Sequence, residues 1–149
     1  MNLPDAFDEA VTISPVGWVA KQAKLYEESG GTKGLTANGA PCLLLDYRGR
    51  RSGRWHRTVL IYGPDNGSFL VVGSNGGSDS HPLWYHSIVE NPDVNVRVGP
   101  DRFAARADVL SPEGKARVWP GLVAIFAPYK GYQQKTARDI PVVRLSRTS

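Results

Sequence analysis

Residues 45–62, LDYRGRRSGRWHRTVLIY, decide the fold of this chain and concentrate its positive charge. Five arginines stand around Gly49 and Gly53, and the apolar residues 59–61 follow them. Arginine carries five fixed N–H donors and stays charged at physiological pH, while glycine allows a tight turn and a close approach to a ligand. The stretch therefore predicts two strands joined by a turn that binds phosphate or carboxylate, with a solvated basic hairpin tip as the alternative.

The composition is that of an ordinary soluble domain. The 149 residues are 41% hydrophobic and 21% charged, which predicts a single domain over 1–149. A net charge of +4 favours anionic partners such as nucleic acid, phosphorylated cofactors or acidic lipid. The single cysteine, Cys42, excludes an internal disulfide framework, and its apolar neighbours predict that it is buried. The sequence shows no membrane-spanning apolar run and no signal-peptide pattern, so we expect a cytoplasmic protein.

The pattern of apolar and turn residues predicts an α+β fold. Six short strands are predicted at 42–47, 57–62, 69–73, 94–98, 103–109 and 142–145, with a loop at 34–41 and a turn at 63–67. Helices are predicted to open at Ser14, Ser80 and Ser111, each close to a proline, and a short helical segment holds Tyr129 and Tyr132. The third helix should bury a stripe made of Trp119, Leu122, Val123 and Phe126. We therefore expect a small barrel of about six mostly antiparallel strands with three to four peripheral helices.

The first of these helices, at 14–29, is amphipathic and basic. Its apolar positions recur at helical spacing, and a Gly-Gly pair ends it. Trp18, Lys21 and Lys24 lie outside that apolar stripe. Packing against the domain is the expected use of such a helix. Peripheral contact with a membrane, through Trp18 and the lysines, is the alternative.

Several kinds of chemistry do not fit the motifs. His81 and His86 are five residues apart and point to different helix faces, so we predict no metal site. Ser74 lacks the G-x-S-x-G frame of a serine hydrolase, and GRRSG lacks the spacing of a phosphate-binding Walker loop. The arginines gather in one turn instead of following a face, which disfavours nucleic acid.

Five motifs in fixed order resemble the deazaflavin-dependent nitroreductase family of actinobacteria. They are GRRSG (49–53), VVGSNGG (71–77), HPLWYHSIVENPDV (81–94), APYKGYQ (127–133) and DIPVV (139–143). The resemblance covers a core of about 35–146. It implies a split β-barrel that binds 8-hydroxy-5-deazaflavin (coenzyme F-420), whose phosphodiester and glutamate tail suit the arginines.

The resemblance also assigns roles to residues. The coenzyme-binding positions that it implies are Arg50, Arg51, Ser52, His56, Arg57, Thr58, Val59, Leu60, Ile61, Val72, Gly73, Ser74, Asn75, Leu83, Trp84, Tyr85, His86, Ser87 and Tyr129. The implied catalytic residues on the acceptor side are Ser74, Tyr129 and Tyr132. In this scheme arginines bind the anionic groups, backbone groups of 72–75 hold the ring edge, and Trp84 and Tyr85 form a wall.

The implied reaction is hydride transfer from the reduced deazaflavin to a quinone, enone or nitroaromatic acceptor. Two alternatives remain open: an FMN- or FAD-dependent oxidoreductase on the same barrel, and a non-catalytic cofactor-binding protein. The chain departs from the family in two places. Trp55-His56 stands where Pro-Arg is usual, and Asn75 stands where some members carry lysine. Reduction of nitroimidazoles therefore does not follow from the resemblance.

Overall fold

The computed structural model describes residues 12–13 and 17–149, with side chains from residue 17 onward. The elements in chain order are β1 (Thr12–Ile13), α1 (Gly17–Glu28), β2 (Thr36–Ala37), β3 (Ala40–Arg48), β4 (Trp55–Asp65), β5 (Ser68–Val72), the 3-10 turn η2 (Asn75–Gly77), α2 (Leu83–Glu90), β6 (Asp93–Val98), β7 (Asp101–Val109), α3 (Pro112–Ile125), α4 (Pro128–Lys135) and β8 (Val142–Arg147).

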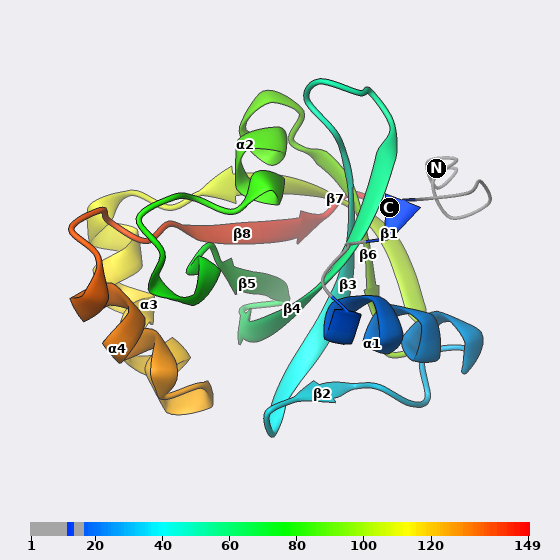
Figure 1. Cartoon of the computed structure of the whole chain (residues 1–149), viewed down its shortest axis with the longest axis horizontal. Coiled ribbons are helices and arrows are strands. Elements are labelled where there is room, and N and C mark those ends of the chain that lie inside the picture. Colours follow the sequence, from blue (N-terminus) through cyan, green and yellow to red (C-terminus); the bar gives the residue numbers. More distant parts are fainter. Residues whose placement is uncertain (1–11, 14–16) are drawn as a thin grey trace.

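Six of the strands close into an antiparallel barrel (Figure 1). The strand order is β4-β5-β8-β7-β6-β3, and β3 pairs with β4 to complete the ring. The short strand β1 adds to β4 in parallel, and β2 adds to β3. The predicted split β-barrel with peripheral helices is confirmed.

Alternation along each strand separates the barrel interior from its outer face. On β3, Leu43 and Leu45 point inward and join a core that includes Phe103 and Leu145. The intervening Cys42 and Leu44 point outward, where α1 covers them. This period of two is the property of strands from which the sheet was predicted.

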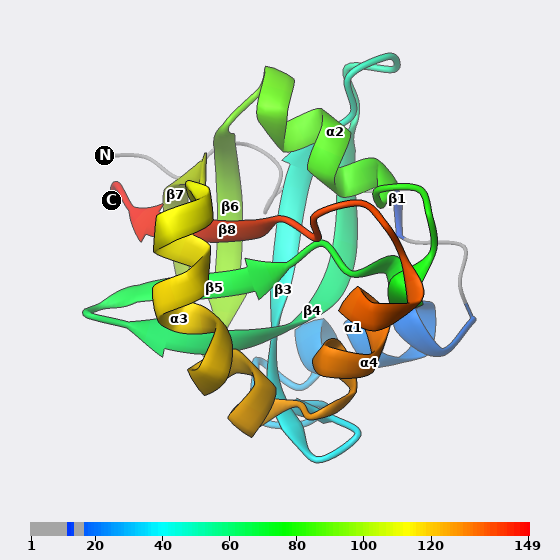
Figure 2. The ribbon, with the colours of Figure 1, turned by 90° about the vertical axis from the view of Figure 1, so that its left-hand side faces the viewer.

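The helices cover the barrel in three places, as the two views in Figures 1 and 2 show. Helix α2 adds Trp84 and Ile88 to the barrel core. Helix α1 packs Val19, Ala23 and Tyr26 against the outer face of β3 and β4. Helices α3 and α4 pack on β5 and β8 at the other side. Among the residues described, no helix is long and apolar enough to cross a membrane.

Local turn chemistry accounts for the differences from the predicted strands. Residues 34–41 include the short strand β2, because Asn38 and Gly39 both adopt positive φ and form a tight hairpin turn back to β3. Likewise, β4 continues to Asp65, and its turn consists of Asn66 and Gly67 alone. The predicted turn at 63–67 was therefore too long.

The helix starts agree with the sequence in one case and differ in another. Ser111 caps α3 and its hydroxyl accepts a hydrogen bond from the N–H of Gly114, as the Ser-Pro-Glu pattern predicts. Helix α2 instead has Pro82 at its N-cap, so the predicted cap at Ser80 was wrong. Of the predicted stripe on α3, only Leu122 is fully buried. The start predicted for the first helix, at Ser14, lies outside the described residues.

A buried ion cluster fastens α1 to the outside of the barrel. Arg57 donates two hydrogen bonds of 2.7 Å to the carboxylate of Asp46 across the β3–β4 pair. Glu27 of α1 lies 2.8 Å from the guanidinium of Arg97 and also pairs with Arg102. Asp46 is 1% exposed, so this pair is shielded from water. The bidentate geometry offsets the cost of burying the two charges.

Removing one member of the buried pair should destabilise the protein strongly. Asp46→Ala leaves the Arg57 guanidinium buried without its main partner, and we expect a loss of about 3–5 kcal/mol in the free energy of unfolding. Urea unfolding followed by circular dichroism measures it. The matched control is Asp101→Ala, which removes an exposed pair with Arg147 and should cost less than about 1 kcal/mol. Equal small losses in both variants would contradict the role given to the buried pair.

Candidate active site

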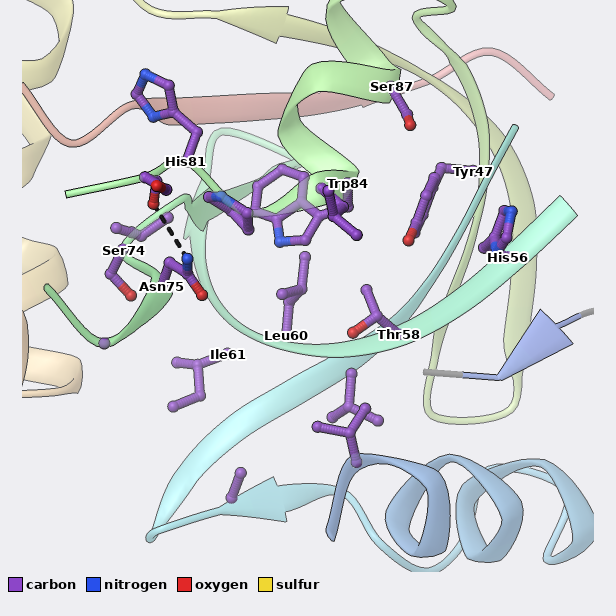
Figure 3. A pocket seen from close by; sticks show the side chains of 18 of the residues that line it. Tyr47, His56, Thr58, Leu60, Ile61, Ser74, Asn75, His81, Trp84 and Ser87 are labelled. Atoms are coloured by element: carbon purple, nitrogen blue, oxygen red, sulfur yellow. Dashed lines mark hydrogen bonds between the residues drawn. The ribbon is translucent and has the colours of Figure 1, made fainter. Parts of the chain in front are cut away.

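A cavity of about 1150 Å³ lies alongside β4 (Figure 3). Segments distant in sequence form its walls: α1, β2, the turn between β3 and β4, β4 itself, the loop after β5, α2, and the region of α4. The lining residues are Trp18, Val19, Ala37, Asn38, Tyr47, Gly49, Arg50, Arg51, Ser52, His56, Thr58, Val59, Leu60, Ile61, Val72, Ser74, Asn75, Gly76, Ser80, His81, Pro82, Leu83, Trp84, Ser87, Phe126, Tyr129 and Tyr132. The cavity is large enough for an extended cofactor together with a second small molecule.

The basic rim, residues 49–54, forms one edge of the cavity. Its turn is closed by hydrogen bonds from Gly49 N–H to the Arg54 carbonyl and from Gly53 N–H to the Gly49 carbonyl. A Cβ on Gly49 would lie 2.7 Å from both Ser52 Oγ and His56 Nε2, so a larger residue here would displace these side chains. The side chains of Arg50 and Arg51 are exposed and pair with no described residue. Two guanidinium groups are thus available to an anion.

His56 connects the basic rim to the strands. Its Nε2 lies 3.2 Å from Ser52 Oγ, and its ring stacks on that of Tyr47 at 5.5 Å. The guanidinium of Arg48 lies over the ring of the adjacent Trp55, with Cζ of Arg48 4.8 Å from the ring centre. The Trp55-His56 pair therefore orders the turn, while His56 also lines the cavity.

The glycine loop, residues 74–77, forms the opposite edge. The backbone of Ser74 has the right-handed helical conformation. Asn75, Gly76 and Gly77 instead adopt positive φ angles of 46°, 64° and 80°. A right-handed residue followed by a left-handed one turns successive N–H groups to the same side, which makes a concave site for anionic or carbonyl oxygens. The N–H groups of Asn75 and Gly76 have no hydrogen-bond acceptor among the described residues. They are free to bind a ligand in the cavity.

Apolar and aromatic side chains fill the space between these two edges. Leu60 and Ile61 of β4 and Trp84 of α2 lie around the centre of the view in Figure 3. Near α4, Phe126 packs edge-on against Tyr129, with ring centres 5.0 Å apart. Burial, assisted by the neighbouring Tyr132, raises the pKa of Tyr129 above its ordinary value. The Tyr129 hydroxyl therefore stays protonated and can donate a hydrogen bond.

The structure brings most of the predicted site residues together in this one cavity. It does not do so for Arg57, Gly73, Tyr85 and His86, which are absent from the lining. Arg57 is the main correction, because its guanidinium is paired with Asp46 beneath α1 and is not available to a coenzyme. Tyr85 and His86 follow Trp84 on α2 and so face other directions, and the ring of Tyr85 lies tilted against that of His81, with ring centres 4.6 Å apart.

Other lining residues were not predicted as site residues. They include Trp18, Tyr47 and Phe126, together with Gly76 and His81. Gly76 and His81 lie inside motifs that carry the family resemblance, so the sequence held a signal for them. The sequence predicts Trp18 to lie on an amphipathic helix, with contact to a membrane as the alternative. Tyr47 and Phe126 have no local pattern that distinguishes them from core residues.

The residues present fit the coenzyme that the sequence suggested. A deazaflavin with a phosphodiester and a glutamate tail needs cations, backbone donors and an apolar aromatic wall, and the cavity offers all three. Among the described residues, no group of three or more His, Cys, Asp or Glu side chains is placed to hold a metal. The barrel and its cavity define a split-barrel protein whose site suits an anionic, aromatic cofactor.

Comparison with known proteins defines the family. Residues 18–147 match the model of the F420H(2)-dependent quinone reductase family. The chain belongs to that family.

Individual relatives agree with this assignment. An F420H(2)-dependent quinone reductase of Mycobacterium tuberculosis is 39% identical over 127 residues, which cover 83% of this chain and 85% of the relative. A solved F420-H2 dependent reductase has a TM-score of 0.67 and 34% identity, and covers 71% of this chain and 94% of its own. A second solved structure, described as a domain-swapped dimer, has a TM-score of 0.69 and 34% identity. The match covers 89% of this chain and 100% of that chain.

An arginine of the basic rim should contribute to coenzyme affinity. Arg51→Ala removes one charged hydrogen-bond donor, worth about 1.5–3 kcal/mol, and should raise the Kd for coenzyme F-420 roughly ten- to a hundredfold. Arg106→Ala is the control, since Arg106 is an exposed residue of β7 outside the cavity lining. Tryptophan fluorescence follows both titrations at low salt. If the two variants bind with the same affinity, the basic rim is only a solvated hairpin tip.

Proposed function

We propose that this protein transfers a hydride from reduced coenzyme F-420 to a quinone. One observation carries the proposal: a single cavity combines an anion-binding rim, free backbone N–H groups and the protonated phenol of Tyr129 around an apolar centre. Family membership supports the choice of coenzyme and of acceptor class. Enones and nitroaromatics are further acceptors of the same electrophilic kind.

The basic rim and the glycine loop form the coenzyme side of the site. Arg50 and Arg51 would bind the phosphodiester and the glutamate carboxylates through charge-assisted hydrogen bonds. The N–H groups of Asn75 and Gly76 would bind a carbonyl edge of the ring, and Trp84, which is 6% exposed, would form an apolar wall. These groups orient the coenzyme, which supplies the hydride when bound, and exclude water.

The region of α4 forms the acceptor side. Reduction of a quinone to its hydroquinone takes up one hydride and one proton at an oxygen. Tyr129 and Tyr132 present phenols, and Ser74 presents a hydroxyl, to this part of the cavity. A hydrogen bond from such a donor stabilises the negative charge that develops on the quinone oxygen. We assign this positioning and stabilising role to Ser74, Tyr129 and Tyr132.

The test of function has two steps. Purified protein is titrated separately with coenzyme F-420, FMN and FAD while tryptophan fluorescence is followed, and Trp84 should report binding. Reduced coenzyme F-420 is then mixed with menadione, and its oxidation is followed by absorbance. We expect binding of coenzyme F-420 and enzyme-dependent oxidation. Tight binding of FMN or FAD without a response to coenzyme F-420 would overturn the proposal, and binding without oxidation would indicate a carrier.

Peripheral membrane contact through α1 is a separate proposal. Trp18 is 56% exposed at the edge of the cavity, and Lys21, Lys24 and Leu25 are also exposed on the same helix. Such a surface can lie against anionic lipid. Co-sedimentation with phosphatidylglycerol vesicles should fall in Trp18→Ala and at high salt. Absence of any wild-type protein in the vesicle pellet at low salt would rule this contact out.

A further inference from the structure

Arg138 lies outside the cavity lining and binds the backbone of the glycine loop. Its guanidinium donates hydrogen bonds to the carbonyls of Gly73, Ser74 and Ser78, at 3.1, 2.8 and 2.8 Å. Its Nη1 also lies 3.0 Å from Nδ1 of His81. One planar side chain thus fixes both ends of the loop and the segment that leads into α2.

The rest of the segment 136–141 supports the same loop. Thr136 Oγ1 donates to Asp79 Oδ1 at 2.8 Å, and Gly73 N–H donates to the Pro141 carbonyl at 2.9 Å. A Cβ on Gly73 would lie 2.8 Å from Pro141 Cγ, so Gly73 packs closely against the proline ring. This segment follows α4 directly. The loop with the free N–H groups is therefore connected to the helix that carries the acceptor-side tyrosines.

The contact with Arg138 defines the protonation state of His81. A guanidinium can only donate, so Nδ1 of His81 must accept and the ring proton must sit on Nε2. The other groups that face His81 are the rings of Tyr85 and His86, while Asp79 lies on the Arg138 side. Burial first, and then the charges of Arg138 and His86, lower the pKa of His81 below its ordinary value. A protonated His81 would set an N–H and a positive charge against the guanidinium.

We propose that Arg138 is a positioning residue for the coenzyme, and that its hold on the glycine loop requires His81 to be neutral. Neutral His81 accepts from Arg138, which keeps the N–H groups of Asn75 and Gly76 directed into the cavity. Protonation of His81 removes that acceptor and repels the guanidinium, so the loop loosens. Acidification should therefore weaken coenzyme binding through a group that never touches the reacting atoms. The identity of the ligand rests on the proposed function, whereas the Arg138–His81 contact does not.

The sign of the pH dependence follows from the lowered pKa of His81. The neutral form, and with it the interaction, is complete well above the ordinary histidine value of about 6.5 and is lost as the pH falls through the lowered value. Comparison with His81→Gln separates this effect from titration of the coenzyme itself. Glutamine keeps an oxygen acceptor for Arg138 but does not titrate.

The experiment measures the Kd of coenzyme F-420 between pH 5 and 8 for three variants and the wild type. Arg138→Lys cannot reach three carbonyls with one ammonium group, so its Kd at pH 7.5 should rise roughly ten- to a hundredfold. The control is Arg144→Lys, which should bind as the wild type does. Arg144 lies on β8 and pairs with Asp65 at the end of β4. The wild type should lose affinity as the pH falls through the lowered pKa of His81, on the acid side of the ordinary value of about 6.5, and His81→Gln should lose less.

Two further measurements need no coenzyme. Nitrogen NMR of the ligand-free protein should show His81 with a bare Nδ1 and a protonated Nε2 at pH 7.5. Amide exchange at Gly77 and Ser78, whose N–H groups donate to the carbonyls of Ser74 and Asn75, should be faster in Arg138→Lys than in Arg144→Lys. A protonated Nδ1, equal exchange rates, or an unchanged acid loss in His81→Gln would each overturn the inference. Failure of the wild type to bind coenzyme F-420 would instead refute the proposed function.

Discussion

The pairing of β3 with β4 is the interaction on which the rest of the structure depends. It runs without interruption from Cys42 opposite Ile61 to Arg48 opposite Trp55 and closes the barrel. The inward side chains of these two strands contribute to the barrel core, and α1 packs against their outward side chains. The Asp46–Arg57 pair lies within this ladder, so the charge that fixes α1 is placed by the same register. A shift of one residue would exchange the two faces and remove both.

The site follows from the two ends of this ladder and from the strand after it. The turn between β3 and β4 becomes the basic rim, and β4 itself becomes the floor of the cavity. Because Arg57 is paired inside the fold, the cations available to a ligand are Arg50 and Arg51. The second edge of the cavity is the glycine loop after β5. Hydrogen bonds from Thr136 and Arg138 support this loop. Anion binding and the acceptor wall thus meet in one cavity beside β4.

Much of the fold could be predicted because its signals are local. Alternation placed the core strands, and Ser-Pro-Glu placed the start of α3. The family motifs placed most of the cavity lining. The role of Arg57 could not be read in this way, since its partner Asp46 is eleven residues away and nothing local marks the pair as buried. Arg138 was missed for the same reason, because the carbonyls it contacts lie about sixty residues earlier in the chain. Tertiary contacts of this kind leave no periodic pattern in the sequence.

We infer that the coenzyme lies between the basic rim and the glycine loop, beside β4. Backbone amide NMR during a titration with coenzyme F-420 tests it most directly, because each amide reports on its own surroundings. We expect saturable shifts at residues 50–52 and 74–76, with the amides of Arg106 and Asp108 on β7 unchanged. Shifts confined to β6 and β7, or no saturable shift at either edge of the cavity, would contradict it.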